Sequence, residues 1–304
     1  MRLLTRADFD GLACAALLKE LGLIDAWKFV HPKDMQDGKV EVGSNDILAN
    51  VPYVPGCKMW FDHHSSEKDR IGTEVKFEGV SRHADSAARI IFEYYDGPKR
   101  FGRLEEFVKA VDKIDAAKLT VDEIQRPNGW VLLGFIVDPR TGLGRFRDFR
   151  LNTIELLEEL IDACRGKTID EILAMPDIQE RVKVYQEQEP LFKDMLLKHT
   201  RTDGNVIITD LRGVDPIYTG NRFLIYSLFL EQNISIWVVD GRAKQNCPIA
   251  AGHSILNRGS KTDVGALMLK YGGGGHAQVG TCQVAYDEAD KVIAELTAKM
   301  KSDG

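Results

Sequence analysis

Several acidic and imidazole side chains occur in this sequence at positions where they could bind a divalent cation together. They are Asp8, Asp10, Asp62, His63, His64, Asp112 and Asp115. Carboxylates combined with one or two imidazoles suit Mn²⁺ or Mg²⁺, and less often Fe²⁺ or Zn²⁺. Because neighbouring carboxylates repel one another unless a cation lies between them, this set indicates a site for one or two ions. Such an ion lowers the pKa of bound water and neutralises phosphoryl oxygens, so the expected chemistry is phosphoryl hydrolysis.

Each part of this set also has an ordinary structural explanation. An Asp-x-Asp pair such as Asp8 and Asp10 is common in a turn or at a helix N-terminus. One of the adjacent histidines could be a core residue with satisfied hydrogen bonds, and Asp112 and Asp115 could lie on a solvated helix face. The metal interpretation therefore depends on whether the fold brings these segments together.

Strands and helices that alternate along the first half of the chain must position these residues. The predicted strands are 1–4, 27–31, 46–51 and 57–61, and the predicted helices are 12–23, 86–95 and 104–115. This alternation predicts a parallel sheet with helices on both faces. Ligands of such sheets bind beyond the carboxyl ends of the strands. Asp8, Asn50 and Asp62 all occur at predicted strand ends, so we expect them at one edge of the sheet.

The second half of the chain predicts a smaller α/β domain. Residues 151–199 are charged and mostly helical, and the turn-rich segment 199–205 follows them. We therefore expect two domains, 1–198 and 199–304. Within the second domain, the predicted strands are 205–211, 234–240, 248–255 and 279–286, and the predicted helices are 223–231, 262–272 and 287–300.

Two segments of the second domain are candidates for phosphate binding. Four consecutive glycines precede His276, and glycine backbones can approach an anion closely and surround it with N–H groups. An arginine beside small polar residues suits bidentate phosphate recognition. The candidates are Asn257, Arg258, Gly273, Gly274, Gly275 and His276. A flexible loop is the alternative, and no Gly-Lys-Ser/Thr follows the glycines, so a P-loop is not indicated. The basic segment 138–150 is predicted to be a surface turn, with a substrate-side loop as the alternative.

Composition narrows the range of partners. The chain has 304 residues and a net charge of −6, with 44% hydrophobic and 28% charged residues. This net negative charge argues against an extended electrostatic interface with long nucleic acid, but it is compatible with a small anionic substrate. No apolar segment is long enough to span a bilayer, and the N-terminus lacks the apolar core of a signal peptide. We expect a cytoplasmic protein without a membrane partner, and a homodimer remains open.

Taken in order, Asp8-x-Asp10-Gly11, Asp62-His63-His64, Asp115 and the Gly-Gly-Gly-Gly-His segment 272–276 resemble the DHH phosphoesterases that carry a C-terminal DHHA1 domain. Exopolyphosphatase-like proteins, nanoRNases, cyclic-dinucleotide phosphodiesterases and the larger RecJ exonucleases belong to this group. The resemblance covers nearly the whole chain. It implies an N-terminal DHH domain, a C-terminal DHHA1 domain and a substrate bound between them.

The resemblance also implies roles for individual residues. Asp8, Asp10, His63 and Asp115 match metal ligands, and Asp112 is a further candidate. His64 matches the residue that polarises the phosphate or assists the leaving group, and Asp62 supports the two histidines. Arg258 and the segment 272–276 match the part of DHHA1 that holds the substrate.

The sequence departs from the family pattern beside Asp8. Residues 4–7, where the family has a histidine or an acid, contain no ordinary metal ligand, and Asn50 stands where the family has an aspartate. The ion position that Asp8 would share is therefore weakened, whereas the other keeps Asp10, His63 and Asp115. We expect Arg6 to take the place of the missing cation and to bind a phosphate oxygen.

These inferences predict a metal-dependent phosphoesterase, with one or two Mn²⁺ or Mg²⁺ ions. Its expected reaction is hydrolysis of phosphodiester or phosphoanhydride bonds in a short oligonucleotide, a dinucleotide or polyphosphate. The alternative is a degenerate, non-hydrolytic nucleotide- or anion-binding protein with an incomplete metal site.

Overall fold

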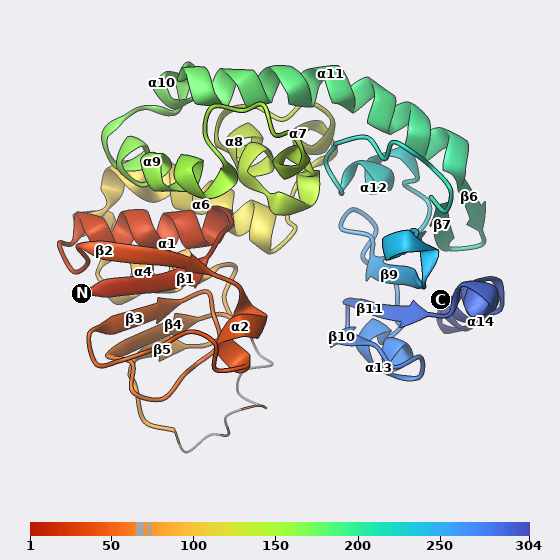
Figure 1. Cartoon of the computed structure of the whole chain (residues 1–304), viewed down its shortest axis with the longest axis horizontal. Coiled ribbons are helices and arrows are strands. Elements are labelled where there is room, and N and C mark those ends of the chain that lie inside the picture. Colours follow the sequence, from red (N-terminus) through yellow and green to blue (C-terminus); the bar gives the residue numbers. More distant parts are fainter. Residues whose placement is uncertain (65–69, 71, 73–74) are drawn as a thin grey trace. The chain divides into compact units, whose positions relative to one another are not determined.

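The computed structural model describes residues 1–64, 70, 72 and 75–304, which form two compact units (Figure 1). The first unit comprises Met1–Lys118 and Pro127–Tyr185, and the second comprises Leu119–Arg126 and Gln186–Gly304. The division lies inside the long helix α11 (Pro176–His199).

The first unit is built on a five-stranded parallel sheet with the order β2-β1-β3-β4-β5. In that order the strands are Ala26–Val30, Arg2–Arg6, Asp46–Ala49, Met59–Asp62 and Glu78–Ser81. The prediction of a parallel sheet is confirmed. Strand β5 was not predicted, because its sequence Glu-Gly-Val-Ser has neither an apolar run nor a strong alternation.

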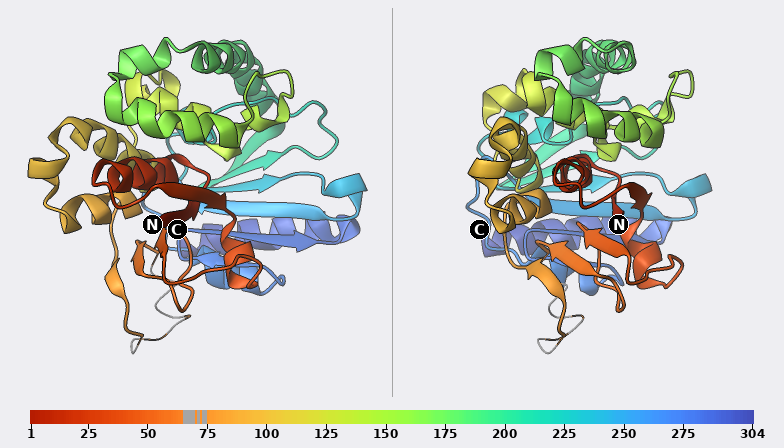
Figure 2. Two further views of the ribbon diagram at one scale, coloured as in Figure 1. Left: turned by 60° about the vertical axis from the view of Figure 1, so that its left-hand side comes forward. Right: turned by 90° about the vertical axis from the view of Figure 1, so that its left-hand side faces the viewer.

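Helices α1 (Phe9–Glu20) and α4 (Ala87–Tyr94) contact one face of this sheet (Figure 2). Helix α6 (Glu105–Asp115) packs against these two helices. The opposite face is covered by the short helix α2 (Pro32–Gln36) and by loops. Neighbouring residues of a strand point to opposite faces. Thus Trp60 lies in the cluster with Met35 of α2, and Phe61 contacts Tyr94 of α4 with its ring centroid 5.3 Å away.

Helix α8 (Gly129–Val137) is a further element of the first unit that the sequence left unassigned. It is apolar on nearly every side, and most of its residues are buried. Its residue Trp130 stacks on Phe107 of α6, with ring centroids 4.7 Å apart. The structure also describes helices α5 (Gly97–Arg100), α9 (Thr153–Gly166) and α10 (Ile169–Leu173) in this unit.

The second unit contains a mixed six-stranded sheet with the order β10-β11-β9-β8-β7-β6. In that order the strands are Gly274–His276, Val279–Val284, Cys247–His253, Ile234–Val238, Val206–Asp210 and Thr200–Asp203. Strands β7 and β8 are parallel, and the other neighbours are antiparallel. The helices of this unit are α7 (Val121–Gln125), α12 (Leu224–Leu228), α13 (Val264–Leu269) and α14 (Ala289–Asp303).

Among the residues that the structure describes, no helix combines the length and the apolar composition needed to cross a membrane.

Candidate metal centre

The structure brings three of the predicted ligands together beyond the carboxyl ends of β1 and β4. Asp10 lies in the first turn of α1, His63 follows β4, and Asp115 is the last residue of α6. Their ligand atoms all lie within 4.8 Å of one another. The Nε2 atom of His63 is 3.1 Å from Oδ2 of Asp115 and 3.8 Å from Oδ2 of Asp10. These distances would allow one cation to contact all three side chains.

The orientation of the His63 ring suits metal binding. Its Nδ1 atom lies 3.3 Å from the carbonyl oxygen of Ala84. Because a carbonyl oxygen only accepts hydrogen bonds, Nδ1 carries a proton, and Nε2 is the ring atom left to bind a metal ion. Nε2 is buried and makes no well-formed hydrogen bond to a described residue. A buried imidazole nitrogen that faces two carboxylates, with the other ring nitrogen bound to a carbonyl oxygen, is an arrangement typical of metal ligands, so these residues fit a divalent ion.

Asp10 is held in place by the N-terminus of α4. Its Oδ2 accepts a hydrogen bond from the backbone N–H of Ala87 at 2.9 Å, and its Oδ1 accepts one from Ala88 at 2.8 Å. Ser86 caps this helix, since its Oγ accepts from the N–H of Arg89. A helix N-terminus favours a negative charge, and the position of Asp10 is therefore set by α4 as well as by α1.

Burial and nearby carboxylates raise the pKa of Asp10. Burial, and then the charge of Asp115, raises the pKa of Asp10 to about 7, although His63 and the N–H of Ala88 oppose the shift. In the described part of the chain, neither Asp10 nor Asp115 forms an ion pair with a lysine or an arginine. A bound cation would relieve this repulsion.

His64 and Asp62 form a hydrogen-bonded pair beside the three ligands. The Nδ1 atom of His64 is 2.9 Å from Oδ1 of Asp62, which is fully buried. Burial lowers the pKa of His64, but the hydrogen bond and the charge of Asp62, with smaller contributions from Asp115 and Asp10, raise it overall to about 9. His64 is therefore protonated near neutral pH in this structure and can donate hydrogen bonds to an anion.

Asp8 lies near the three ligands but is bound to other groups. Its Oδ1 accepts from the N–H of Gly11 at 2.9 Å and from Nδ2 of Asn50 at 3.0 Å, and its Oδ2 lies 3.1 Å from Nε of Arg6. A Cβ atom on Gly11 would lie 1.9 Å from the carbonyl oxygen of Arg6, so the close approach of α1 to β1 requires glycine here. Asp8 caps α1 and holds Arg6.

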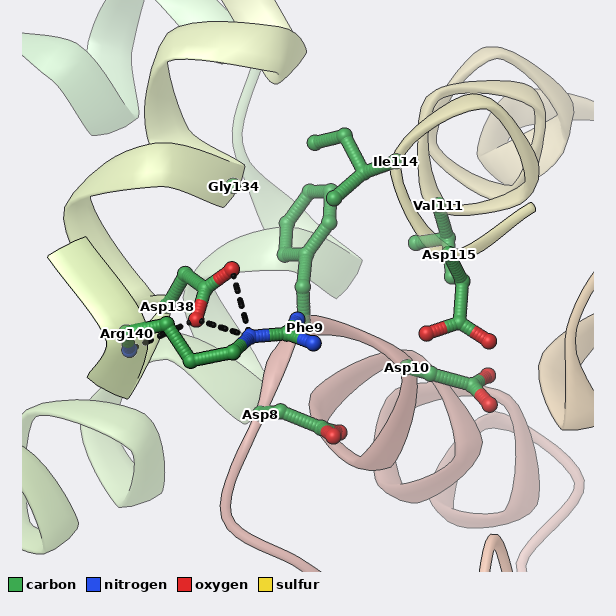
Figure 3. Close-up of a pocket in the computed structure, with 9 residues that line it drawn as sticks. All are labelled: Asp8, Phe9, Asp10, Val111, Ile114, Asp115, Gly134, Asp138 and Arg140. Atoms are coloured by element: carbon green, nitrogen blue, oxygen red, sulfur yellow. Dashed lines mark hydrogen bonds and ion pairs between the residues drawn. The ribbon is translucent and has the colours of Figure 1, made fainter. Parts of the chain in front are cut away.

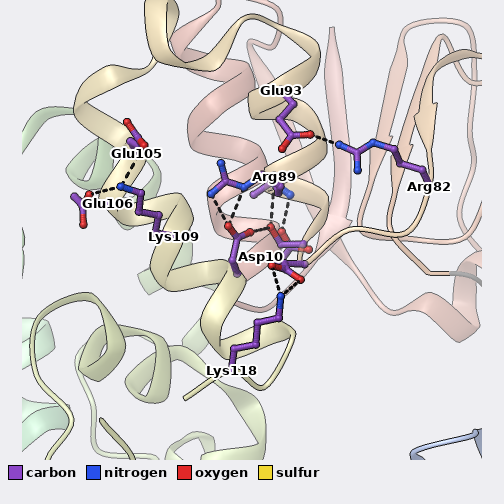
Figure 4. A network of polar contacts seen from close by, with 12 residues as sticks. Asp10, Arg82, Arg89, Glu93, Glu105, Glu106, Lys109 and Lys118 are labelled. Carbon is purple, nitrogen blue, oxygen red and sulfur yellow. Dashed lines mark hydrogen bonds and ion pairs between the residues drawn. The ribbon is translucent and has the colours of Figure 1, made fainter. Parts of the chain in front are cut away.

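Asp112 also lies outside the group of three. Its Oδ1 accepts a hydrogen bond from Ser86 at 2.7 Å, and its Oδ2 pairs with the guanidinium of Arg89 (Figure 4). These contacts link α6 to α4 and account for both oxygens of the carboxylate.

Two residues of the first unit that the sequence did not single out line the same pocket. Arg140 and Asp138 follow α8 and lie beside Asp8, Asp10 and Asp115 (Figure 3). The only signal in the sequence was the basic segment 138–150, for which the prediction was a surface turn. Without the packing of α8 against α6, nothing in the sequence places Arg140 near the acidic residues.

The glycine run lies in the second unit and is partly a strand. Gly274–His276 forms β10, which pairs with β11. A Cβ atom on Gly273 would lie 2.0 Å from the carbonyl oxygen of Thr281, and one on Gly275 would lie 2.2 Å from that of Val279. Packing against β11 therefore requires both glycines. His276 is exposed, which leaves it accessible to a ligand.

Asn257 and Arg258 lie in the loop between β9 and α13 of the second unit. Nδ2 of Asn257 donates to the carbonyl oxygen of Glu231 at 3.0 Å, and Nε of Arg258 donates to that of Ile255 at 3.2 Å. These bonds stabilise the loop, and their roles in substrate binding remain predictions.

Comparison with solved structures places the fold. An exopolyphosphatase-related protein from Bacteroides fragilis is 14% identical with a TM-score of 0.53, and the match covers 99% of this chain and 92% of that chain. RecJ from Thermus thermophilus, solved in complex with Mn²⁺, is 13% identical with a TM-score of 0.54; the match covers 98% of this chain and 51% of RecJ. At these identities the comparisons show a shared fold. No family model and no curated protein sequence matches the chain.

The chain belongs to the DHH/DHHA1 family of phosphoesterases, and it is a hydrolase of that class. The match that shows this is the structure of PggH, a pGpG-specific phosphodiesterase from Vibrio cholerae. PggH is 47% identical to this chain with a TM-score of 0.88, and the match covers 100% of this chain and 99% of PggH. The expected family and fold class are thereby confirmed.

Proposed function

We propose that this protein is a metal-dependent phosphodiesterase that hydrolyses a short linear dinucleotide such as pGpG. Asp10, His63 and Asp115 would hold the ion, which we expect to be Mn²⁺ or Mg²⁺. The observation that carries the proposal is the buried Nε2 atom of His63, which faces two carboxylates and makes no hydrogen bond within the described part of the chain. The substrate class is supported by the identity of 47% to a pGpG-specific phosphodiesterase along the full chain.

The roles of the neighbouring residues follow from their contacts. When bound, a divalent ion supplies a water of lowered pKa and neutralises charge on the phosphoryl oxygens. The N–H groups of Ala87 and Ala88 hold Asp10 before any substrate arrives. His64, protonated and held by Asp62, donates a hydrogen bond to the phosphoryl group, and its proton can pass to the leaving oxygen as the P–O bond breaks. Asn257, Arg258 and the exposed His276 remain predicted phosphate ligands in the second unit.

The variant His63→Ala tests the site. We expect hydrolysis of pGpG with Mn²⁺ to fall by at least about 1,000-fold, because one ligand in three is lost. Circular dichroism should be unchanged, since His63 follows a strand and has a single backbone contact through its ring. The matched control is His83→Ala, which removes an exposed imidazole from the same unit. Unchanged turnover in His63→Ala would remove the proposed site.

A substrate panel tests the proposed activity. Purified protein is incubated with pGpG, pApA or a short polyphosphate, each with Mn²⁺ and with Mg²⁺, and the products are separated by chromatography. Cleavage of the dinucleotides in preference to polyphosphate is the expected result. Binding of pGpG without product under every condition would instead establish the non-hydrolytic alternative.

A further inference from the structure

Arg140 is positioned by a short motif at the end of α8. Its Nε donates to Oδ1 and Oδ2 of Asp138, at 2.8 and 3.2 Å, and its backbone N–H donates to Oδ1 at 2.8 Å. Asp138 is 6% exposed and ends α8. Three residues after Asp138, Oγ1 of Thr141 donates to the carbonyl oxygen of Phe135 at 2.8 Å. The turn is thus tied to the helix, and the arginine is held at a defined place.

The outer part of the guanidinium is available to a ligand. Nη1 and Nη2 of Arg140 make no hydrogen bond to any residue that the structure describes, and the side chain is 40% exposed. Figure 3 shows the guanidinium on the side of the pocket opposite Asp10 and Asp115. With Nε engaged by a buried carboxylate, the two remaining amino groups form the planar fork that suits phosphate oxygens.

A second arginine lies beside the same aspartate. Arg6 ends β1 and pairs through Nε with Oδ2 of Asp8, and its side chain is 37% exposed. Asp8 also interacts electrostatically with Arg140. Burial raises the pKa of Asp8, and the charges of Arg6 and, more weakly, Arg140 oppose that shift. The region around Asp8 therefore carries its own positive charge, in contrast to the region around Asp10.

The donors around Asp8 leave it poorly suited to a metal ion. Gly11 and Asn50 already donate to Oδ1, and Arg6 forms an ion pair with Oδ2. Asn50 also brings a neutral amide where a second carboxylate would be needed to share an ion. A cation placed here would also be repelled by two guanidinium groups. The chain's residues fit one ion, at Asp10, His63 and Asp115, and they do not fit a second ion at Asp8.

We propose that Arg140 and Arg6 bind phosphate oxygens of the substrate beside a single divalent ion, with Asp138 and Asp8 as the residues that position them. The arginines then neutralise the negative charge of the phosphoryl oxygens, which is the role that a second ion would otherwise have. The proposal rests on the proposed function for the identity of the substrate. The recognition of a phosphate anion by the two arginines is nevertheless measurable without turnover.

The test measures phosphate binding and metal content in wild type, Arg140→Gln and the control Arg147→Gln. Arg147 is exposed and lies in the same loop. Isothermal titration of inorganic phosphate into Mg²⁺-loaded protein should show affinity reduced by about 10- to 100-fold in Arg140→Gln, the loss expected for charged hydrogen bonds. Arg147→Gln should stay within about twofold of wild type. Equilibrium dialysis should find one tightly held Mn²⁺ per chain in all three proteins.

The outcomes separate this proposal from the proposed function. Arginine-dependent phosphate binding in a protein that cleaves no substrate would remove the hydrolase assignment and leave the arginine site standing. Equal phosphate affinity in wild type and Arg140→Gln, or no phosphate binding in wild type, would overturn the arginine site even if pGpG is cleaved. Two tightly held Mn²⁺ ions per chain would overturn the single-ion arrangement.

Discussion

Asp8 and Asp10 are separated by one residue, yet the structure surrounds them with opposite kinds of neighbours. Asp8 is met by an N–H group, an amide and a guanidinium. Asp10 accepts two backbone N–H groups but faces the carboxylate of Asp115 and the Nε2 atom of His63. The protein therefore compensates the first carboxylate itself, whereas the second lies in the group of three side chains that we propose as the metal site. Equal residue types two positions apart need not have equal functions.

The largest expected difference between the two regions is in metal affinity. Asp10→Asn should weaken Mn²⁺ binding by at least about 100-fold, because it removes a ligand and its charge. Asp8→Asn should change the affinity by less than about threefold, since asparagine keeps the N-cap acceptor for Gly11. Titration of Mn²⁺ followed by electron paramagnetic resonance measures both. Similar losses of Mn²⁺ affinity in the two variants would contradict the proposed difference between the two carboxylates and would show that Asp8 is also a ligand.

Metal removal should also distinguish Asp8 from Asp10, through its effect on the free energy of unfolding. An ion that binds only the folded protein at 100 times its dissociation constant stabilises it by about 2.7 kcal/mol. Urea unfolding with Mn²⁺, compared with EDTA, should show this gain in wild type and in Asp8→Asn. It should be absent in Asp10→Asn. A gain of the same size in Asp10→Asn would place the ion elsewhere.

Loss of the residue that caps α4 should reduce Mn²⁺ affinity less than loss of Asp10 itself. Ser86→Ala removes the cap of α4 and the hydrogen bond to Asp112, and we expect a loss of about 1–2 kcal/mol in the free energy of unfolding. Because α4 also orients Asp10, Mn²⁺ affinity should fall by about 10-fold. Asn152→Ala, which uncaps α9, serves as the control. It should lower stability by a similar amount and leave Mn²⁺ affinity unchanged.

The smallest effect is expected at an exposed ion pair near the site. Lys118 pairs with Asp85 at 2.7 Å, and its side chain is 55% exposed (Figure 4). Lys118→Met should change the free energy of unfolding by less than about 0.5 kcal/mol, because water screens exposed pairs. Urea unfolding checks the value. A loss above about 1 kcal/mol would show that this exposed ion pair stabilises the folded protein as strongly as the buried polar contacts do.

Sequence periodicity was sufficient for the main architecture of the first unit. Alternating apolar strands and helices predicted its parallel sheet, and the rule that ligands bind beyond the carboxyl ends of such strands predicted that Asp10 and His63 would meet. Strand β5 and helix α8 were not predicted. β5 lacks an apolar pattern, and α8 is apolar on all sides, which removes the amphipathic signal of a helix.

The residue types and their spacing were enough to predict which side chains are available for metal chemistry, because residue type limits what a group can coordinate and the strand pattern limits where it can lie. Only the tertiary structure showed which donors contact Asp8 and Asp10, and only it placed Arg140 near them. Both outcomes depend on which donors and charges approach a carboxylate from segments distant in the chain: Asn50, the N-terminus of α4 and the turn after α8. Local sequence carries no record of those approaches, since packing between helices and strands decides them.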